Sequence, residues 1–166
     1  MDLQMVDQLL EILEQEVKGY NEMLELSKNK RDVIIKGKAD ELQNIVEAEQ
    51  SLVMQMGKLE AFREELTGKI SRDIGLEPSE LTISEMKKHF PEVYKEKATD
   101  YQEKLSATLK ELKEINDLNS KLIKNSLEFV NFMINLYTSS SVGSNNYVNT
   151  GTIKETGNKS LFDVKL

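Results

Sequence analysis

The sequence predicts an all-α fold: an elongated antiparallel three-helix bundle or coiled coil with one short extra helix and a flexible C-terminal tail. Apolar residues recur at alternating spacings of three and four along three long stretches, which is the period of one helix face. Helix breakers are rare, with two prolines among 166 residues. Charged residues make up 31% of the chain and aromatic residues 6%, a mixture that suits long helices better than a sandwich or an α/β fold.

The first helix is expected over residues 2–36. Its main apolar stripe follows the three-four rhythm through Leu3, Val6, Leu10, Leu13, Val17, Tyr20 and Leu24. A second stripe lies beside it and consists of Met5, Leu9, Ile12, Met23 and Leu26. Two adjacent stripes require two neighbouring helices. Gly37 predicts the end of this helix, and Asp40 with Gln43 resembles a capping pair that starts the next. So short a connector makes the two helices antiparallel.

The second helix is expected over residues 40–74 and is ended by Gly75 and Pro78. Its seam consists of Leu42, Ile45, Glu49, Leu52, Met56, Leu59, Arg63, Leu66 and Ile70. Two of these positions carry charge, and two interpretations stay open for them. Glu49 and Arg63 either lie at the edge of the seam and extend into water, or each pairs across the hairpin and fixes its register.

A short helix over residues 83–89 and a third long helix over residues 91–137 follow. Thr82 and Glu85 form a T-x-x-E capping box at the start of the short helix. Pro91 suits the first turn of the long one. The seam of the long helix runs through Tyr94, Ala98, Tyr101, Leu105, Thr108, Leu112, Ile115, Asn119, Leu122, Ser126, Phe129, Met133 and Leu136.

The composition changes after Tyr137, so we expect a helical domain over residues 1–137 and a disordered tail over residues 138–166. The tail is rich in Ser, Asn, Gly and Thr and has no helical period. Such a segment buries too little apolar surface to offset the entropy of ordering. A terminal apolar motif with Leu161, Phe162 and Leu166 closes the chain.

Neither catalysis nor a bound cofactor or metal is predicted. The chain has no cysteine and a single histidine. Met86 stands three residues before His89, so the Glu-x-x-His motif of a di-iron bundle is absent. We interpret His89 as an exposed residue near a helix C-terminus. Phosphate loops and nucleophile motifs are also missing. The charged residues are therefore interpreted as solvated helix faces, and the protein is not expected to be an enzyme.

Charge and hydropathy exclude two further classes of partner. The net charge is −7 and the basic residues are interleaved with a larger number of acids, whereas a nucleic-acid surface concentrates Lys and Arg. No apolar run reaches 18 residues, so no membrane insertion is expected. The acidic N-terminus lacks the pattern of a signal peptide, and the cytoplasm is the expected compartment.

The stretch from Ser126 to Tyr137 is the candidate binding site. Eight of its twelve residues are large and apolar, and they are expected to point all around the helix, not along one stripe. The candidate binding residues are Leu127, Val130, Phe132, Met133, Ile134, Leu136 and Tyr137. In one interpretation, these residues are covered by the short helix, by the tail or by a second copy of the chain. The last case would make the protein a homo-oligomer. In the other interpretation, they bind an amphipathic helix of a partner.

Several segments resemble the FlgN family of flagellar export chaperones. The block KGKADELQNIVEAEQSLVMQMGKLEAFREEL matches the family's turn, apolar helix and Leu-Glu-x-x-Arg signature. The matching residues are Gly37, Asp40, Leu42, Glu49, Leu59, Glu60 and Arg63. LIKNSLEFVNFMINLY, a tail tyrosine and the terminal LFD motif resemble the Gram-positive branch of the family. The resemblance covers essentially the whole chain.

The resemblance implies a cytoplasmic chaperone for the hook-associated proteins of the hook–filament junction. Such a chaperone binds the C-terminal helical segments of its clients, prevents premature assembly and delivers them to the type III export gate. The family docks on the gate protein through a tyrosine near the C-terminus. The candidates for that contact here are Tyr137 and Tyr147, with Leu161 and Phe162.

Two other functions stay open at the level of sequence. One is a structural coiled-coil or scaffold protein that homodimerises through residues 126–137. The other is a different helical type III secretion chaperone, or a coiled-coil helper of the export ATPase, with a different client.

Overall fold

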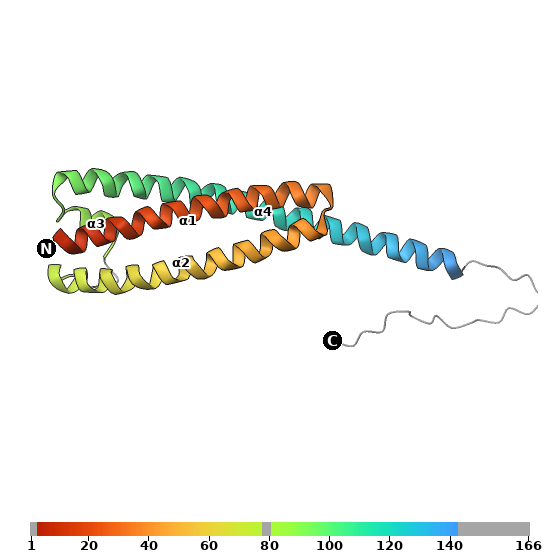
Figure 1. Ribbon diagram of the computed structural model, residues 1–166, viewed down its shortest axis with the longest axis horizontal. Helices are drawn as coiled ribbons and strands as arrows, with labels where there is room; N and C mark the ends of the chain where they lie inside the picture. Colours follow the sequence, from red (N-terminus) through yellow and green to blue (C-terminus); the bar gives the residue numbers. More distant parts are fainter. Residues whose placement is uncertain (1–2, 78–80, 143–166) are drawn as a thin grey trace, which may run out of the picture. The chain divides into compact units, whose positions relative to one another are not determined.

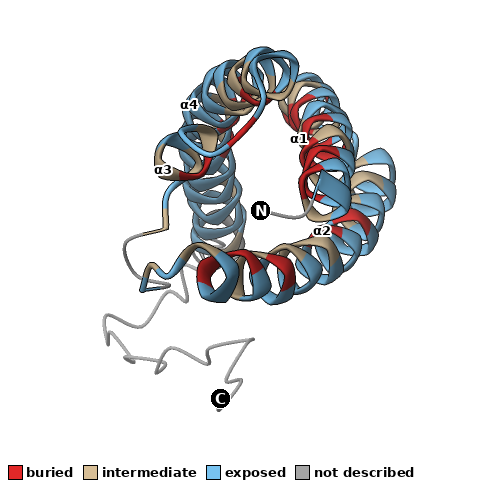
Figure 2. Ribbon diagram, turned by 90° about the vertical axis from the view of Figure 1, so that its left-hand side faces the viewer, coloured by how far each residue is buried: buried red, intermediate tan, exposed pale blue. Residues whose placement is uncertain are grey.

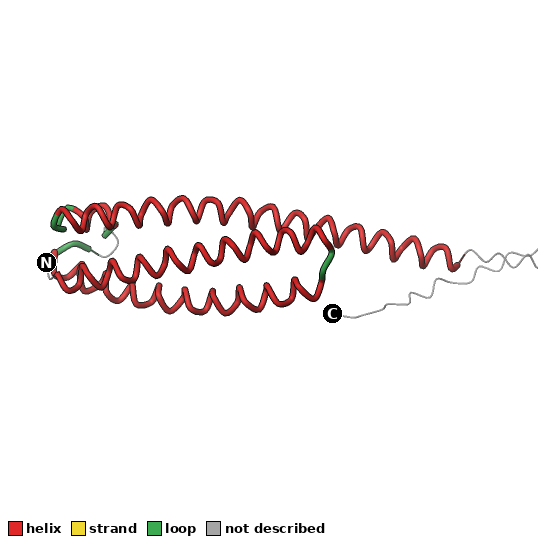
Figure 3. Tube along the Cα trace, turned by 45° about the horizontal axis from the view of Figure 1, so that its top comes forward, coloured by secondary structure: helices red, strands yellow, loops and turns green. Residues whose placement is uncertain are grey.

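The computed structural model describes residues 3–77 and 81–142 as four helices joined by short loops (Figure 1). The helices are α1 (Leu3–Lys36), α2 (Ala39–Ile74), α3 (Ile83–Lys87) and α4 (Glu92–Val142). Figure 3 shows helices and loops and no strand in the described segments. The all-α prediction is confirmed, and each long helix begins within one residue of its expected start.

The chain divides into two compact units, residues 1–127 and residues 128–166. The first contains α1, α2, α3 and most of α4, whereas the second begins inside α4. The domain boundary expected after Tyr137 stays a prediction. No helix in the described part of the chain has the length and apolar character needed to cross a membrane.

Gly37 ends α1, as the sequence predicted. It adopts a φ of 66°, in the left-handed region that glycine enters at little cost. The Lys38 N–H donates to Val33 O and the Gly37 N–H to Ile34 O, which is the Schellman arrangement. The expected capping pair of Asp40 with Gln43 is wrong. Because Schellman closure needs only two residues, α2 begins at once with Lys38 as an N-cap that makes no side-chain cap hydrogen bond.

The connection from α2 to α4 also follows its sequence signals. Gly75 ends α2 with a φ of 74°, and its N–H donates to Ser71 O; Pro78 lies outside the described residues. The Glu85 N–H donates to the Thr82 hydroxyl at 3.2 Å, so this half of the capping box is confirmed. The short helix ends at Lys87, two residues before its expected end. Pro91 directly precedes α4, and its carbonyl accepts from Tyr94 N–H.

The core of the first unit lies between the three long helices. Figure 2 looks along them from the end at which the N-terminus lies and shows buried segments, in red, on α1 and α2. One cluster at this end joins all four helices: Val6, Leu9, Leu10 and Leu13 of α1, Leu66 and Ile70 of α2, Met86 of α3, then Phe90 and Ala98. A second cluster consists of Met23, Leu24, Leu52, Met56 and Leu112. Both apolar stripes of α1 are used, as predicted.

α1 lies closer to α2 than to α4. The two helices approach closely at Gly19, where a Cβ atom would lie 2.2 Å from the sulfur of Met56. Several contacts between α1 and α4 are instead polar. The Thr108 hydroxyl donates to the side-chain carbonyl of Asn21 at 2.9 Å, and the Tyr101 hydroxyl donates to Glu14 at 3.3 Å. The hairpin is thus the tighter part of the bundle.

α4 continues five residues beyond its expected end at Tyr137, to Val142. Ser and Thr were interpreted as the start of a tail, but here they support the helix. The Thr138 hydroxyl donates to Ile134 O at 2.9 Å, and the Ser139 hydroxyl donates to Asn135 O at 2.6 Å. Hydroxyl groups can satisfy carbonyls one turn back in this way, and the first helix breaker is Gly143. Residues 143–166 lie outside the described part of the chain.

Candidate functional site: an exposed apolar face and two polar layers

The predicted binding residues form one exposed surface on α4, here called the α4 apolar face. Six of the seven are exposed: Leu127 59%, Val130 50%, Phe132 61%, Ile134 45%, Leu136 49% and Tyr137 70%. Met133 is half-buried, and Phe129 adds a further exposed ring at 63%. Large apolar side chains gathered on a surface in this way mark an interaction site.

The shape of this face follows from helix geometry. At 100° per residue, its apolar side chains cover an arc of about 220°, and only a narrow wedge is polar. That wedge consists of Glu128, Asn131 and Asn135. One neighbouring helix covers roughly 100° of a helix surface. The α4 apolar face is therefore wide enough to contact two helices of a partner.

The same geometry places Phe132 and Ile134 on opposite flanks of the face. They are two residues apart, so their side chains point about 160° away from each other. Ile134 shares its flank with Leu127, Val130 and Tyr137, whereas Phe132 lies beside Leu136. From the sequence, Phe132 and Ile134 were assigned to one binding site because neither residue lies on the seam of the helix. Since they lie on opposite flanks of the face, each flank can be tested by a separate substitution.

Of the three predicted tail contacts, none can be placed. Tyr147, Leu161 and Phe162 lie outside the described residues, and their role stays a prediction. His89 is exposed and follows the end of α3 by two residues, as predicted. Within residues 3–77 and 81–142, no group of three or more His, Cys, Asp or Glu side chains is arranged to hold a metal ion.

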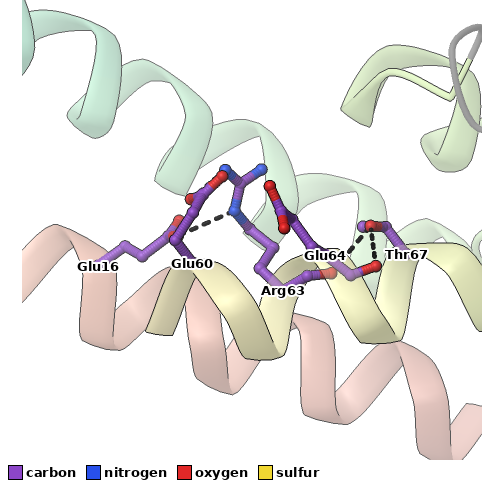
Figure 4. A network of polar contacts seen from close by, with 5 residues as sticks. All are labelled: Glu16, Glu60, Arg63, Glu64 and Thr67. Atoms are coloured by element: carbon purple, nitrogen blue, oxygen red, sulfur yellow. Dashed lines mark hydrogen bonds and ion pairs between the residues drawn. The ribbon is translucent and has the colours of Figure 1, made fainter. Parts of the chain in front are cut away.

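Arg63 forms a polar layer between α1 and α2 (Figure 4). Its Nε donates to Glu16 Oε1 at 2.9 Å, and a terminal nitrogen donates to Glu60 one turn earlier on α2. Glu16 is 5% exposed. A cavity of about 410 Å³ adjoins this layer, with Leu81 and Met86 on its apolar side. The interpretation that Arg63 pairs across the hairpin is therefore the correct one.

Burial and ion pairing act in opposite directions on the pKa values of Glu16 and Arg63. Removal of Glu16 from water raises the pKa of its carboxyl group, although the charge of Arg63 and its hydrogen bond act in the opposite direction. Burial alone would lower the pKa of Arg63, but hydrogen bonds and the charges of Glu60 and Glu16 together raise it. Burial also raises the pKa of the Tyr20 phenol nearby. The layer joins α1 to α2 at a cost in desolvation.

Glu49 forms a second polar layer, which spans three helices. Its carboxylate accepts from Lys30 Nζ of α1 at 2.7 Å, and the two side chains are 15% and 16% exposed. The Ser27 hydroxyl lies 3.4 Å from Glu49 and 3.1 Å from the side-chain carbonyl of Asn116 on α4. Asn119, one turn later on α4, donates its amide N–H to Ser27 O at 2.9 Å. Glu49 thus also pairs across the hairpin.

Sequence reasoning missed the partners of both charged seam residues. Glu16 and Lys30 fall on the three-four spacing of the second stripe of α1, but as charged residues they were interpreted as solvated. Asn116 was missed because it lies beside the predicted seam of the long helix. The available signal was the charge on the seam itself, because a buried Glu or Arg requires an opposite charge on the facing helix.

The two polar layers join helices to one another. Each carboxylate in them is already held by Arg63 or by Lys30. What the described residues present outward is an apolar surface on a helix. This arrangement suits recognition of another helix.

Comparison with known proteins adds one match. The sequence model of the family described as FlgN protein matches residues 1–155. No curated protein and no solved structure matches the chain. The matched region includes all four helices and the whole α4 apolar face.

Proposed function

Because this chain belongs to the FlgN family and is thus a flagellar type III export chaperone, we propose that its clients are the hook-associated proteins of the hook–filament junction. The α4 apolar face binds the C-terminal helical segments of these clients. The chaperone acts in the cytoplasm, keeps the clients from assembling early and delivers them to the export gate. The observation that carries the proposal is the exposure of seven large apolar residues along eleven positions of one helix.

The physical requirement of a client supports this assignment. An amphipathic client segment that will later pack against other client segments exposes an apolar stripe before assembly. That stripe must be covered until assembly takes place. A helix laid against the α4 apolar face exchanges two exposed apolar surfaces for one buried interface. Each fully buried Phe, Leu or Ile side chain contributes about 1.5–3 kcal/mol. A few such anchors suffice for micromolar binding, which remains reversible at the export gate.

Delivery requires a second contact, and the tail is its proposed location. Tyr147, Leu161 and Phe162 are the candidate residues for docking on the cytoplasmic domain of the export-gate protein, with Tyr137 as a further candidate. This part of the proposal rests on the resemblance to family members. Exchange of Tyr147 for Ala should reduce binding to the gate domain and leave binding of the client unchanged.

The test of client binding uses the two flanks of the face separately. Phe132→Asp and Ile134→Asp each remove an apolar anchor and place a charge in a desolvated interface. Each should weaken binding of a C-terminal helical peptide of a hook-associated protein by at least about tenfold. The double variant should lose about 3 kcal/mol or more, which is over a hundredfold. Calorimetric titration measures the affinities.

Two controls define the outcome. Asn131→Asp changes the polar wedge of the same helix and should leave the affinity unchanged. Thermal melts of all variants should remain close to that of the wild type, because both target residues are exposed. A double variant that binds the peptide normally would show that the face is not the client site. If light scattering instead detects a dimer that only the double variant loses, the face serves self-association.

A further inference from the structure

A cavity inside the first unit is a candidate second contact with the client. It measures about 280 Å³ and lies where α1, α2 and α4 meet, lined by Met23, Lys30, Glu49, Val53, Asn119 and Ile123 among others. Val53 and Ile123 are 58% and 37% exposed. The lining thus combines two exposed apolar side chains with the polar side chains of Lys30, Glu49 and Asn119, and this combination favours a partner side chain with a polar end.

Asn119 is one of the lining residues and carries a hydrogen-bond acceptor that has no partner. The residue is 2% exposed, and its amide N–H is committed to Ser27 O. Its side-chain oxygen is buried and has no partner. A buried carbonyl left in this state is costly, and leucine would fit the same seam position without that cost. Asparagine at such a position is a known means of selecting one partner and one register.

Lys30 supplies unused donors on the same cavity. Its ammonium group carries three N–H donors, and its one described partner is the Glu49 carboxylate at 2.7 Å. A cationic partner side chain would be repelled by Lys30. A carboxylate would be repelled by Glu49 and would have no proton to donate to the Asn119 oxygen. A neutral group that both donates and accepts hydrogen bonds, such as a primary amide, can bond to Asn119 and to Lys30 together.

We propose that this cavity receives the side-chain amide of an asparagine or glutamine that lies in the apolar seam of the client helix. The client amide donates to the Asn119 oxygen and accepts from Lys30, while the neighbouring apolar residues of the client contact Val53 and Ile123. The contact fixes the register of the bound helix. The inference rests on the proposed function, since it assigns a feature to the same client.

The experiment is a double-mutant cycle between the chaperone and its client. The probe is the synthetic C-terminal helical peptide of a hook-associated protein, titrated calorimetrically. Asn119→Leu should weaken binding about tenfold. Thr108→Val is the matched control: it also makes a buried polar seam residue of α4 apolar, but Thr108 bonds to Asn21 and lies outside the cavity lining. It should leave the affinity unchanged.

Peptide variants keep the test independent of chaperone folding. Each Asn or Gln in the peptide seam is exchanged for Leu in turn. One exchange should weaken binding to the wild type about tenfold and leave binding to Asn119→Leu unaffected. If wild type and Asn119→Leu bind every peptide equally well, the cavity holds water only and the inference is overturned. A wild-type chaperone that binds no peptide overturns the proposed function itself.

Discussion

At the scale of single residues, the carboxyl group of Glu16 combines burial with an ion pair to Arg63. It is buried between α1 and α2, and burial outweighs its attraction to Arg63, so its pKa is raised. A carboxyl group on the helix surface behaves in the opposite way: a hydrogen bond from Lys69 and the charge of that residue lower the pKa of Glu65. These two groups therefore make opposite contributions to the pH dependence of stability.

We expect the stability of the wild type relative to Glu16→Gln to increase as the pH falls from about 7 to about 4. A carboxyl group with a raised folded-state pKa favours folding fully below its unfolded pKa, about 4.3. That contribution is lost as the pH rises through the folded pKa. Urea denaturation of both proteins at several pH values gives the difference in free energy of unfolding.

Glu65→Gln is the control, with the opposite sign. Because the pKa of Glu65 is lowered, its contribution is present above the unfolded pKa and is lost on acidification. The wild type should thus lose stability relative to Glu65→Gln as the pH falls below about 4.3, and should show little change between pH 7 and that value. If both differences are flat, neither group is perturbed as the structure indicates.

At the scale of elements, the α1–α2 turn is the most sharply defined connection. Gly37 has a positive φ and open space around its Cα, so a side chain there would be opposed by backbone geometry alone. Gly57, in the middle of α2, also has open space but helical geometry. The same substitution at the two glycines therefore separates backbone strain from helix propensity.

Gly37→Ala should lower the free energy of unfolding by about 1 kcal/mol, because an L-residue is strained in the left-handed region. Gly57→Ala should raise it by about 0.5–1 kcal/mol, because alanine loses less backbone entropy in a helix. Urea unfolding of each variant measures both changes. The same sign at both positions would contradict the turn described for residues 36–38.

Sequence periodicity predicted the elements well and the contacts between them poorly. The bounds of the helices follow from long three-four patterns and from the signals at Gly37, Gly75 and Thr82. These signals depend on local geometry and leave few alternatives. The pairing of Lys30 with Glu49 depends on which faces meet, and periodicity does not contain that information. The candidate binding residues were found as a group, but their division into two flanks required the rotation of one continuous helix.

At the scale of the whole molecule, the first unit is expected to fold without the second. All buried apolar residues in the described part of the chain lie between Val6 and Leu112. A protein truncated after Leu127 should therefore melt within a few degrees of the full chain, with cooperative unfolding. It should no longer bind the client peptide. Circular dichroism and calorimetric titration measure the two properties, and a broad, uncooperative melt would contradict the division into units.

The polar contacts between α1 and α4 also determine the order in which the bundle forms. The hairpin turns over two residues, whereas the bonds from Ser27 to Asn116 and from Asn119 to Ser27 join residues 89 and 92 positions apart. Contacts between distant parts of a chain form later, because more of the chain must be ordered first. During synthesis, the hairpin can close while α4 is still being made. The helix that carries the binding face is then the last to join the bundle.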